Sequence, residues 1–215
     1  MFEISKTFEF SAAHSVHSQR LKPEWAGNTY PKCRRLPGHG HNYILKVFLK
    51  SKELDESQMV TDFGHLKWLK SFIDNCFDHK LIIGSDDPAF DFLFEKLGLI
   101  EGDDFLIPEG EAEFLAVNGE FKIESGRVKR LPIGKLRDFW FITFNNYKGE
   151  EESPLTDFYQ RLIDGISIFK GSPTSENLAK FFFNFVSRNV EPLGVRCSRV
   201  EIYETPTSCA AYYEE

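Results

Sequence analysis

Two segments that alternate between apolar and polar residues constrain the fold of this chain most strongly. FEISKTFEFSAAH, residues 2–14, and HGHNYILKVFLKS, residues 39–51, each place most of their apolar residues on one face. This two-residue period is typical of half-buried β-strands. The apolar face of the first segment runs out at His14, and His39 and His41 share the parity of the apolar residues in the second. We therefore expect two strands whose inward faces end in histidine.

Two further segments have the spacing of amphipathic helices. DFGHLKWLKSFIDNCF, residues 62–77, carries an apolar stripe at helical spacing and delivers Asp78 and His79 at its end. SPTSENLAKFFFNFVSRNV, residues 172–190, starts with a Ser or Thr cap candidate, followed by Glu176 and a second apolar stripe. Both are expected to be helices with one buried face.

The C-terminal stretch RCSRVEIYETPTSCAAYY, residues 196–213, reads as two strands around a short connection. Glu204 has the same parity as the apolar residues before it, so a carboxylate lies at the end of an apolar face. An acid among apolar neighbours more often holds a cationic or amide-like group than it serves as an edge residue. Thr205 adds a hydroxyl next to it.

The middle of the chain, residues 84–172, is the acidic part, with about 18 acidic and 10 basic residues. A short helix is expected in GSDDPAFDFLFEKLGLIEGDD and a strand in DFWFITFNN. Strands are expected around Asn118-Gly119 and Ser125-Gly126, and a helix within SPLTDFYQRLIDGISIF. We predict an α+β insertion at 84–172 that packs against a parent domain formed by residues 1–83 and 173–215.

Composition narrows the class of protein. The 215 residues suffice for one sizeable core, and the formal net charge of -7 without a basic stripe argues against nucleic acid as a partner. No apolar run approaches the roughly 18 residues of a membrane span, and no signal peptide is recognisable, so a cytoplasmic protein without membrane contact is expected. The four cysteines form no CxxC pair and are expected to be free thiols.

The histidines predict a metal site. A His-x-His pair on a strand points both imidazoles to one side, with Cα atoms about 6 to 7 Å apart, and neutral imidazole is a good zinc ligand. The pair alone is a weak signal. His14 supplies a third ligand if the two strands are neighbours, which would leave the fourth position of a zinc ion open to water or substrate.

Cys33 lies in CRRLPGHGHNY, residues 33–43, close to these histidines in sequence. It can be a fourth ligand that closes a structural site, a base or nucleophile near the metal, or an inert buried thiol. Lys32, Arg34 and Arg35 flank it, which favours the thiolate and offers a local cluster for a small anion. Asp78 and His79 are either a carboxylate that orients an imidazole for proton transfer or simply a helix end.

Six segments together resemble the family of 6-pyruvoyl-tetrahydropterin and 6-carboxy-tetrahydropterin synthases. They are FSAAH at 10–14, CRRLPGHGHNY at 33–43, MVTDFGHLK at 59–67, FDHKL at 77–81, PTSENLA at 173–179 and YET at 203–205. They occur in the order typical of the family and span both ends of the chain. The resemblance covers residues 1–83 and 173–215 and leaves out the insertion.

The resemblance implies the tunnelling fold, or T-fold: a four-stranded antiparallel sheet with two helices on one face, assembled into a hexamer as a dimer of trimers with intersubunit active sites. It also implies site roles. Zinc would be held by His14, His39 and His41, with Cys33 as the catalytic thiol and Asp78 with His79 as a second proton-transfer pair. Glu204 and Thr205 would anchor the pterin, Thr174 and Glu176 would line the pocket, and Arg34, Arg35 and Lys80 would contact triphosphate.

The implied reaction is that of a zinc-dependent lyase acting on 7,8-dihydroneopterin triphosphate. Loss of triphosphate and acetaldehyde would give 6-carboxy-5,6,7,8-tetrahydropterin on the route to queuosine and other 7-deazaguanines, and elimination of triphosphate alone would give the 6-pyruvoyl product. The expectation leans to the carboxy product. A non-catalytic, zinc-stabilised pterin-binding module is the alternative from another class, and in that case Cys33 would be a metal ligand.

Overall fold

The computed structural model describes most of the chain as two compact units. The described residues are 1–18, 30–33, 35–96, 100–106, 112–117, 123–126, 130–132, 139–143 and 161–213. The first unit comprises Met1–Ser11, His41–Asp78 and Thr174–Glu215, and the second comprises Ala12–Gly40 and His79–Pro173. Strands β1 (Phe2–His14) and β2 (His39–Ser51) contribute residues to both. The bounds of both strands are those that the alternating patterns predict.

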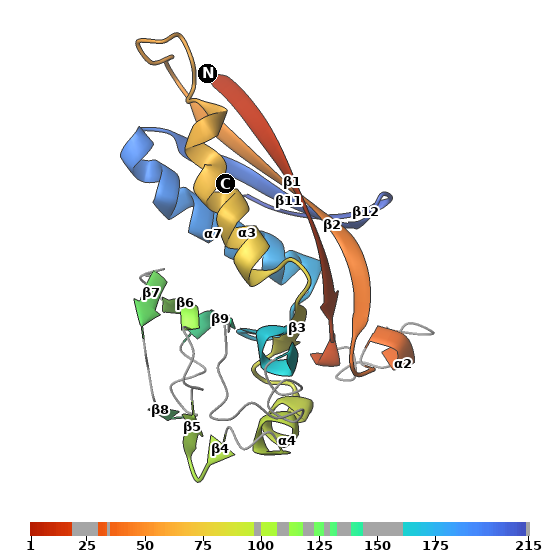
Figure 1. The fold of residues 1–215 in the computed structure, drawn as a ribbon. Helices are drawn as coiled ribbons and strands as arrows, with labels where there is room; N and C mark the ends of the chain where they lie inside the picture. The colour runs from red at the N-terminus through yellow and green to blue at the C-terminus, as the bar shows by residue number, and fades with distance from the viewer. Residues whose placement is uncertain are drawn as a thin grey trace. The chain divides into compact units, whose positions relative to one another are not determined.

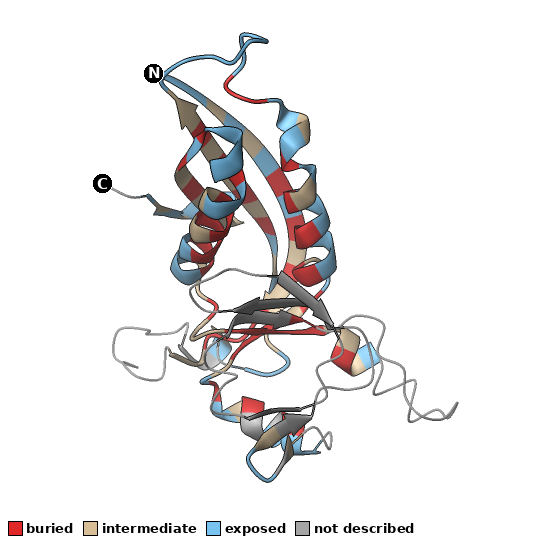
Figure 2. Cartoon of the chain, turned by 90° about the vertical axis from the view of Figure 1, so that its left-hand side faces the viewer, coloured by how far each residue is buried: buried red, intermediate tan, exposed pale blue. Residues whose placement is uncertain are grey.

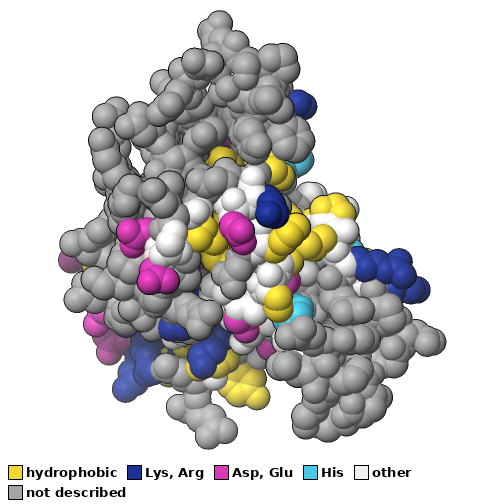
Figure 3. Space-filling view, turned by 90° about the horizontal axis from the view of Figure 1, so that it is seen from below, with side chains coloured by type: hydrophobic (Ala, Val, Ile, Leu, Met, Phe, Trp, Pro, Cys, Tyr) yellow, Lys and Arg dark blue, Asp and Glu magenta, His cyan; other side chains and the backbone are white. Residues whose placement is uncertain are grey.

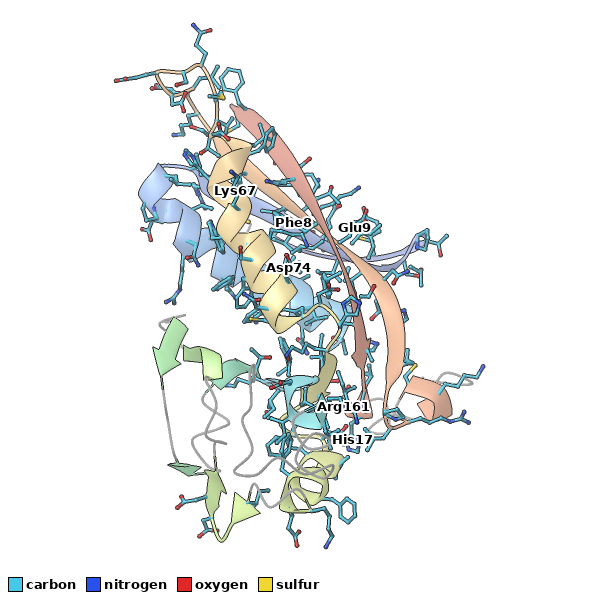
Figure 4. All side chains as sticks on the ribbon, viewed as in Figure 1. Phe8, Glu9, His17, Lys67, Asp74 and Arg161 are labelled. Atoms are coloured by element: carbon cyan, nitrogen blue, oxygen red, sulfur yellow. The ribbon has the colours of Figure 1, made fainter. Side chains whose placement is uncertain are left out.

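The first unit is built on a sheet with the strand order β12-β11-β2-β1 (Figure 1). Strand β11 (Arg196–Thr205) runs antiparallel to β2 and to β12 (Ser208–Tyr212). The two-residue period sorts the side chains of β1, so that Phe8 points toward the helices and Glu9 away from them (Figure 4). Strands β11 and β12 confirm the predicted pair of C-terminal strands.

Two helices lie side by side over one face of this sheet (Figure 1). Helix α3 (Lys67–Cys76) continues the 3-10 turn η2 (Phe63–Leu66), which Asp62 caps through the amide of Gly64. Helix α7 (Ser175–Val190) is capped by the Thr174 hydroxyl and leads into the 3-10 turn η3 (Glu191–Leu193). Both predicted helices are confirmed, and their buried residues are confined to one side (Figure 2).

Aromatic rings fill the space between the helices and the sheet. Phe10 stacks on Tyr43 with ring centroids 5.0 Å apart, and Phe77 meets Phe182 at 4.9 Å. Phe72 and Phe185 join the two helices at 4.4 Å. Each buried ring of this kind contributes about 1.5–3 kcal/mol through removal of apolar surface from water. The core of the first unit is thus an aromatic layer on the inward face of the sheet.

The second unit is organised around two parallel strands, β3 (Leu81–Gly84) and β10 (Ile166–Phe169). The last residues of β1 join them, because Ala13 pairs with Leu81 and His14 with Ile82 in parallel register. On the other side of β10 the order continues through β9, β6 and β7. These strands are β9 (Phe139–Thr143), β6 (Ala112–Val117) and β7 (Ile123–Gly126).

Short elements complete this unit. A small sheet has the order β4-β5-β8, and short helices are also present among the described residues. The elements are α2 (Tyr30–Cys33), α4 (Pro88–Lys96), β4 (Ile100–Glu101), β5 (Asp104–Leu106) and β8 (Arg130–Pro132). The predicted helix near residue 90, the strands on either side of Asn118-Gly119 and the strand in DFWFITFNN are confirmed. The assignment of 84–172 as an insertion stays a prediction.

One expectation for the middle of the chain needs correction. Residues 153–160 of SPLTDFYQRLIDGISIF lie outside the described residues and residues 161–164 are helical, but ISIF is strand β10, buried throughout between β3 and β9. A short apolar run of this kind fits a buried strand and a helix equally well. Ser125-Gly126 forms the end of β7, and the strand that follows it, β8, pairs with β5.

Some broader features can be checked as well. Among the described residues, no helix is long and apolar enough to cross a bilayer. All four cysteines are free thiols, as predicted. On the face drawn in Figure 3, the visible basic side chains of the described residues are interspersed with acidic and hydrophobic ones.

Candidate metal centre and catalytic residues

The three predicted histidines form a group suited to a metal ion. One ring nitrogen from each of His14, His39 and His41 lies within 4.8 Å of the others. His14 is the last residue of β1, and His39 begins β2 with His41 two residues later on the same strand. Among the described residues this is the one group of three or more His, Cys, Asp and Glu side chains with such spacing. The strand-end prediction is therefore confirmed in its geometry.

The environment of His14 fixes which of its nitrogens can bind a cation. Its Nδ1 lies 2.7 Å from the carbonyl oxygen of Pro173. A carbonyl only accepts, so Nδ1 carries the hydrogen and Nε2 presents its lone pair. The Nε2 atoms of His14 and His39 are 3.0 Å apart. A cation shared by the two lone pairs suits this arrangement, and three imidazoles with borderline-soft nitrogen donors fit Zn²⁺.

Backbone hydrogen bonds hold the end of β1 on both sides of His14. The amide of Ala13 donates to the carbonyl of Lys80 at 2.9 Å, and the amide of Ser15 donates to that of Ile82 at 3.3 Å. His14 itself is only 1% exposed. Gly38, just before β2, has a φ of +95°, and a Cβ there would lie 2.6 Å from the His14 carbonyl oxygen. The histidine is thus locked in place by close backbone packing.

Cys33, the predicted catalytic thiol, ends the short helix α2 and is half-buried. Its carbonyl accepts a hydrogen bond from the amide of Val16 at 2.9 Å, which links it to the turn that follows His14. Its sulfur is not a member of the histidine group. Of the basic residues beside it, Arg35 is exposed, and Arg34 lies outside the described residues.

Asp78 and His79 follow α3 as predicted, and Asp78 is anchored within the first unit. Its Oδ1 accepts a hydrogen bond from the Ser11 amide at 2.8 Å. His79 has a φ of +59°, a left-handed conformation that non-glycine residues seldom adopt and that tends to occur at functional positions. The next residue, Lys80, is 7% exposed, and its Nζ donates to the carbonyl of Asp164. The structure therefore gives this ammonium group a partner inside the protein.

The four predicted pterin-contact residues all belong to the first unit. Glu204 and Thr205 end β11, which α7 covers, while Thr174 and Glu176 lie at the start of α7. Burial raises the pKa of the Tyr43 hydroxyl, and the negative charge of Glu204 raises it further.

Sequence reasoning missed the groups that support the histidines. The Pro173 carbonyl, which orients His14, is a backbone atom without a sequence signature. Ser15 and Asp87 form a buried hydrogen bond directly after His14, with 3.1 Å between Oγ and Oδ2. Serine and aspartate are common in turns and at helix starts, so their pairing across 72 residues could not be foreseen.

Comparison with known proteins gives the family. The family model described as 6-pyruvoyl tetrahydropterin synthase matches residues 3–215. A protein of Aquifex aeolicus named 6-carboxy-5,6,7,8-tetrahydropterin synthase is 30% identical over 224 residues, which cover 100% of this chain and 99% of the relative. Both matches run through residues 84–172, the segment that the six sequence motifs leave out.

Solved structures agree in the fold. A crystal structure of an uncharacterised protein from Wolinella succinogenes has a TM-score of 0.69 at 31% identity and covers 100% of this chain and 98% of its own. The 6-pyruvoyl tetrahydropterin synthase of Caenorhabditis elegans has a TM-score of 0.50 at 20% identity, with coverage of 100% and 96%. The architecture is the α+β T-fold, although the number of strands differs in detail. This chain belongs to the 6-pyruvoyl tetrahydropterin synthase family.

Proposed function

We propose that this protein is a zinc-dependent lyase that converts 7,8-dihydroneopterin triphosphate to 6-carboxy-5,6,7,8-tetrahydropterin, with loss of triphosphate and acetaldehyde. The observation that carries the proposal is the group of His14, His39 and His41 in a chain of this family. The full-length similarity to the Aquifex aeolicus 6-carboxy-5,6,7,8-tetrahydropterin synthase supports the carboxy product. The product would enter the route to queuosine and other 7-deazaguanines.

In this proposal the three histidines hold the metal and leave one coordination position open. Zinc in such a site acts as a Lewis acid on side-chain hydroxyls of the substrate and makes an adjacent carbon-bound proton easier to remove. The Nδ1–H of His14, committed to the Pro173 carbonyl, keeps the Nε2 lone pair available.

Proton transfer is assigned to two groups. Cys33, half-buried and outside the histidine group, would remove or return a proton as the thiolate. His79 would serve as the second acid or base, oriented by Asp78, whose Oδ1 is held by the Ser11 amide. That hydrogen bond fixes the position of the carboxylate that would orient the imidazole.

The pterin and the triphosphate need separate contacts. Glu204 suits the pterin, because one carboxylate accepts two parallel N–H bonds from the 2-amino group and ring N–H edge, and Thr205 adds a hydroxyl. Thr174 and Glu176, at the start of α7, would line the same pocket. Arg35, which is exposed, would contact the triphosphate, and Arg34 is proposed with it. Lys80 was a third expected contact, but its bond to the Asp164 carbonyl favours a structural role.

Two other functions remain as alternatives. The family name supports elimination of triphosphate alone, which gives the 6-pyruvoyl product. A zinc-stabilised pterin-binding module without turnover would need a closed metal site, which the position of Cys33 outside the histidine group does not favour.

The proposal also includes a cytoplasmic homohexamer, a dimer of trimers, for which sedimentation should give about six times the mass of one chain.

A product assay distinguishes these functions. Purified full-length protein is incubated with 7,8-dihydroneopterin triphosphate, and the pterin product, triphosphate and acetaldehyde are each quantified. The proposal predicts acetaldehyde and 6-carboxy-5,6,7,8-tetrahydropterin in equal amounts. Release of triphosphate with a 6-pyruvoyl product and no acetaldehyde would replace it by the first alternative, and stoichiometric pterin binding without turnover would replace it by the second.

A further inference from the structure

Asp87 connects the segment after β3 with the turn that follows His14. It lies immediately before α4 and is 5% exposed. Its Oδ1 accepts a hydrogen bond from the Ala89 amide at 2.9 Å, and its Oδ2 accepts one from the Ser15 hydroxyl at 3.1 Å. The Nδ1 atom of His17 lies 3.7 Å from Oδ1. A buried carboxylate is costly unless such donors surround it, so these contacts define its place.

The turn that Asp87 holds joins the two main groups of the proposed site. Ser15 directly follows His14 and is 1% exposed, with its amide bonded to the Ile82 carbonyl. The next residue, Val16, donates its amide hydrogen to the carbonyl of Cys33 at 2.9 Å. Asp87 therefore contacts Ser15 and His17, the residues on both sides of Val16. This short segment directly follows His14 and is hydrogen-bonded to the backbone of Cys33.

We propose that Asp87 is a positioning residue, which acts through Ser15 to fix His14 and, through Val16, the backbone at Cys33. The inference rests on the proposed metal centre. It also gives the segment 84–172 a role in the site, because Asp87 comes from that segment. Capping of α4 needs only one oxygen of the carboxylate, which bonds the Ala89 amide. The other oxygen is committed to Ser15, so the two roles can be separated by mutation.

Zinc affinity separates a positioning role from a purely structural one. The dissociation constant of Zn²⁺ is measured on full-length protein by competition with a chelating dye, and the stability of the metal-free protein is measured in parallel. Ser15→Ala removes the bond to Asp87 and leaves the cap of α4 intact. Ser167→Ala is the matched control, because it removes another buried hydroxyl bond of 2.9 Å, to Thr143, from the same unit.

Residues that orient metal ligands typically influence metal affinity about 10- to 100-fold, and an indirect contact should act at the lower end. We expect Ser15→Ala and Asp87→Ala to weaken zinc binding about 5- to 10-fold and Ser167→Ala less than 2-fold. Asp87→Asn should stay within about 3-fold of the wild type, because its amide oxygen can accept from Ala89 while its NH₂ donates to Ser15.

Two outcomes would overturn the inference, and they differ from each other. If the wild type binds zinc and Ser15→Ala binds it equally well while losing as much stability as Ser167→Ala, Asp87 is structural and the proposed function stands. If the wild type binds no zinc, the proposed metal centre fails and the role of Asp87 fails with it. Should Asp87→Ala not fold, the comparison of Ser15→Ala with Ser167→Ala decides alone.

Discussion

The Nε2 atoms of His14 and His39 lie 3.0 Å apart, although the two residues are 25 positions apart in the sequence. His14 is the last residue of β1, and His39 is the first residue of β2. The Pro173 carbonyl accepts a hydrogen bond from His14 Nδ1. The lone pair of His14 Nε2 therefore faces His39. Two imidazoles in this arrangement suit a shared cation, so removal of one should abolish tight binding of the proposed metal.

His39→Ala should therefore reduce bound zinc from about one ion per chain to a small fraction. His65→Ala is the control, because His65 bonds the Thr61 hydroxyl and is not a member of the group. Elemental analysis after gel filtration measures both. Equal zinc content in His39→Ala and wild type would contradict the assigned ligand set.

Gly38 should be intolerant of any side chain. In Gly38→Ala the new Cβ would lie 2.6 Å from the His14 carbonyl oxygen, in addition to the strain of a positive φ, so unfolding free energy should fall by about 3 kcal/mol. Gly194→Ala is the matched control, since Gly194 has a φ of +70° and nothing within 4 Å of the added Cβ. It should cost about 1 kcal/mol. Urea denaturation compares the two, and similar losses would refute the close approach at His14.

Mutation of Lys80 should affect stability and mutation of Arg35 should affect substrate binding, although the sequence analysis predicted that both contact the triphosphate. Lys80→Met removes a buried donor from the Asp164 carbonyl and should cost about 1–3 kcal/mol in stability. Arg35→Ala should leave stability unchanged, because the side chain is exposed, and should raise KM for the triphosphate substrate about 10-fold. Denaturation and steady-state kinetics test the pair. A raised KM with unchanged stability in Lys80→Met would restore its predicted role.

Tyr203 should titrate at unusually high pH. Its hydroxyl donates a hydrogen bond to Glu201 at 2.9 Å, and this bond is the main cause that raises the pKa of Tyr203 to about 12. The usual tyrosine pKa is near 10, so its contribution to stability is fully present below pH 10 and is lost as pH rises toward 12. Glu201→Gln should lower that pKa in a tyrosinate absorbance titration, whereas Glu95→Gln, at an exposed position of α4, should not.

Sequence patterns predicted the elements that carry the histidines and missed some that support them. The alternation in β1 and β2 predicted both strands, because one face of each must be buried. Strand β10 was missed because ISIF, three apolar residues and Ser167, is too short to show a period that separates a strand from a helix. The histidine group was predicted because all three histidines lie at the ends of the apolar faces of β1 and β2. The contact of His14 with the Pro173 carbonyl and the pairing of Ser15 with Asp87 join segments that are distant in the sequence, so they could not be predicted.

The measurement that tests the account most directly is zinc content together with turnover of 7,8-dihydroneopterin triphosphate, for wild type and Cys33→Ala. Cys209→Ala is the control, because it removes an exposed thiol. The account predicts that Cys33→Ala keeps about one zinc per chain and loses at least about 100-fold in turnover, while Cys209→Ala keeps both. Loss of zinc in Cys33→Ala, or no turnover by the zinc-loaded wild type, would contradict it.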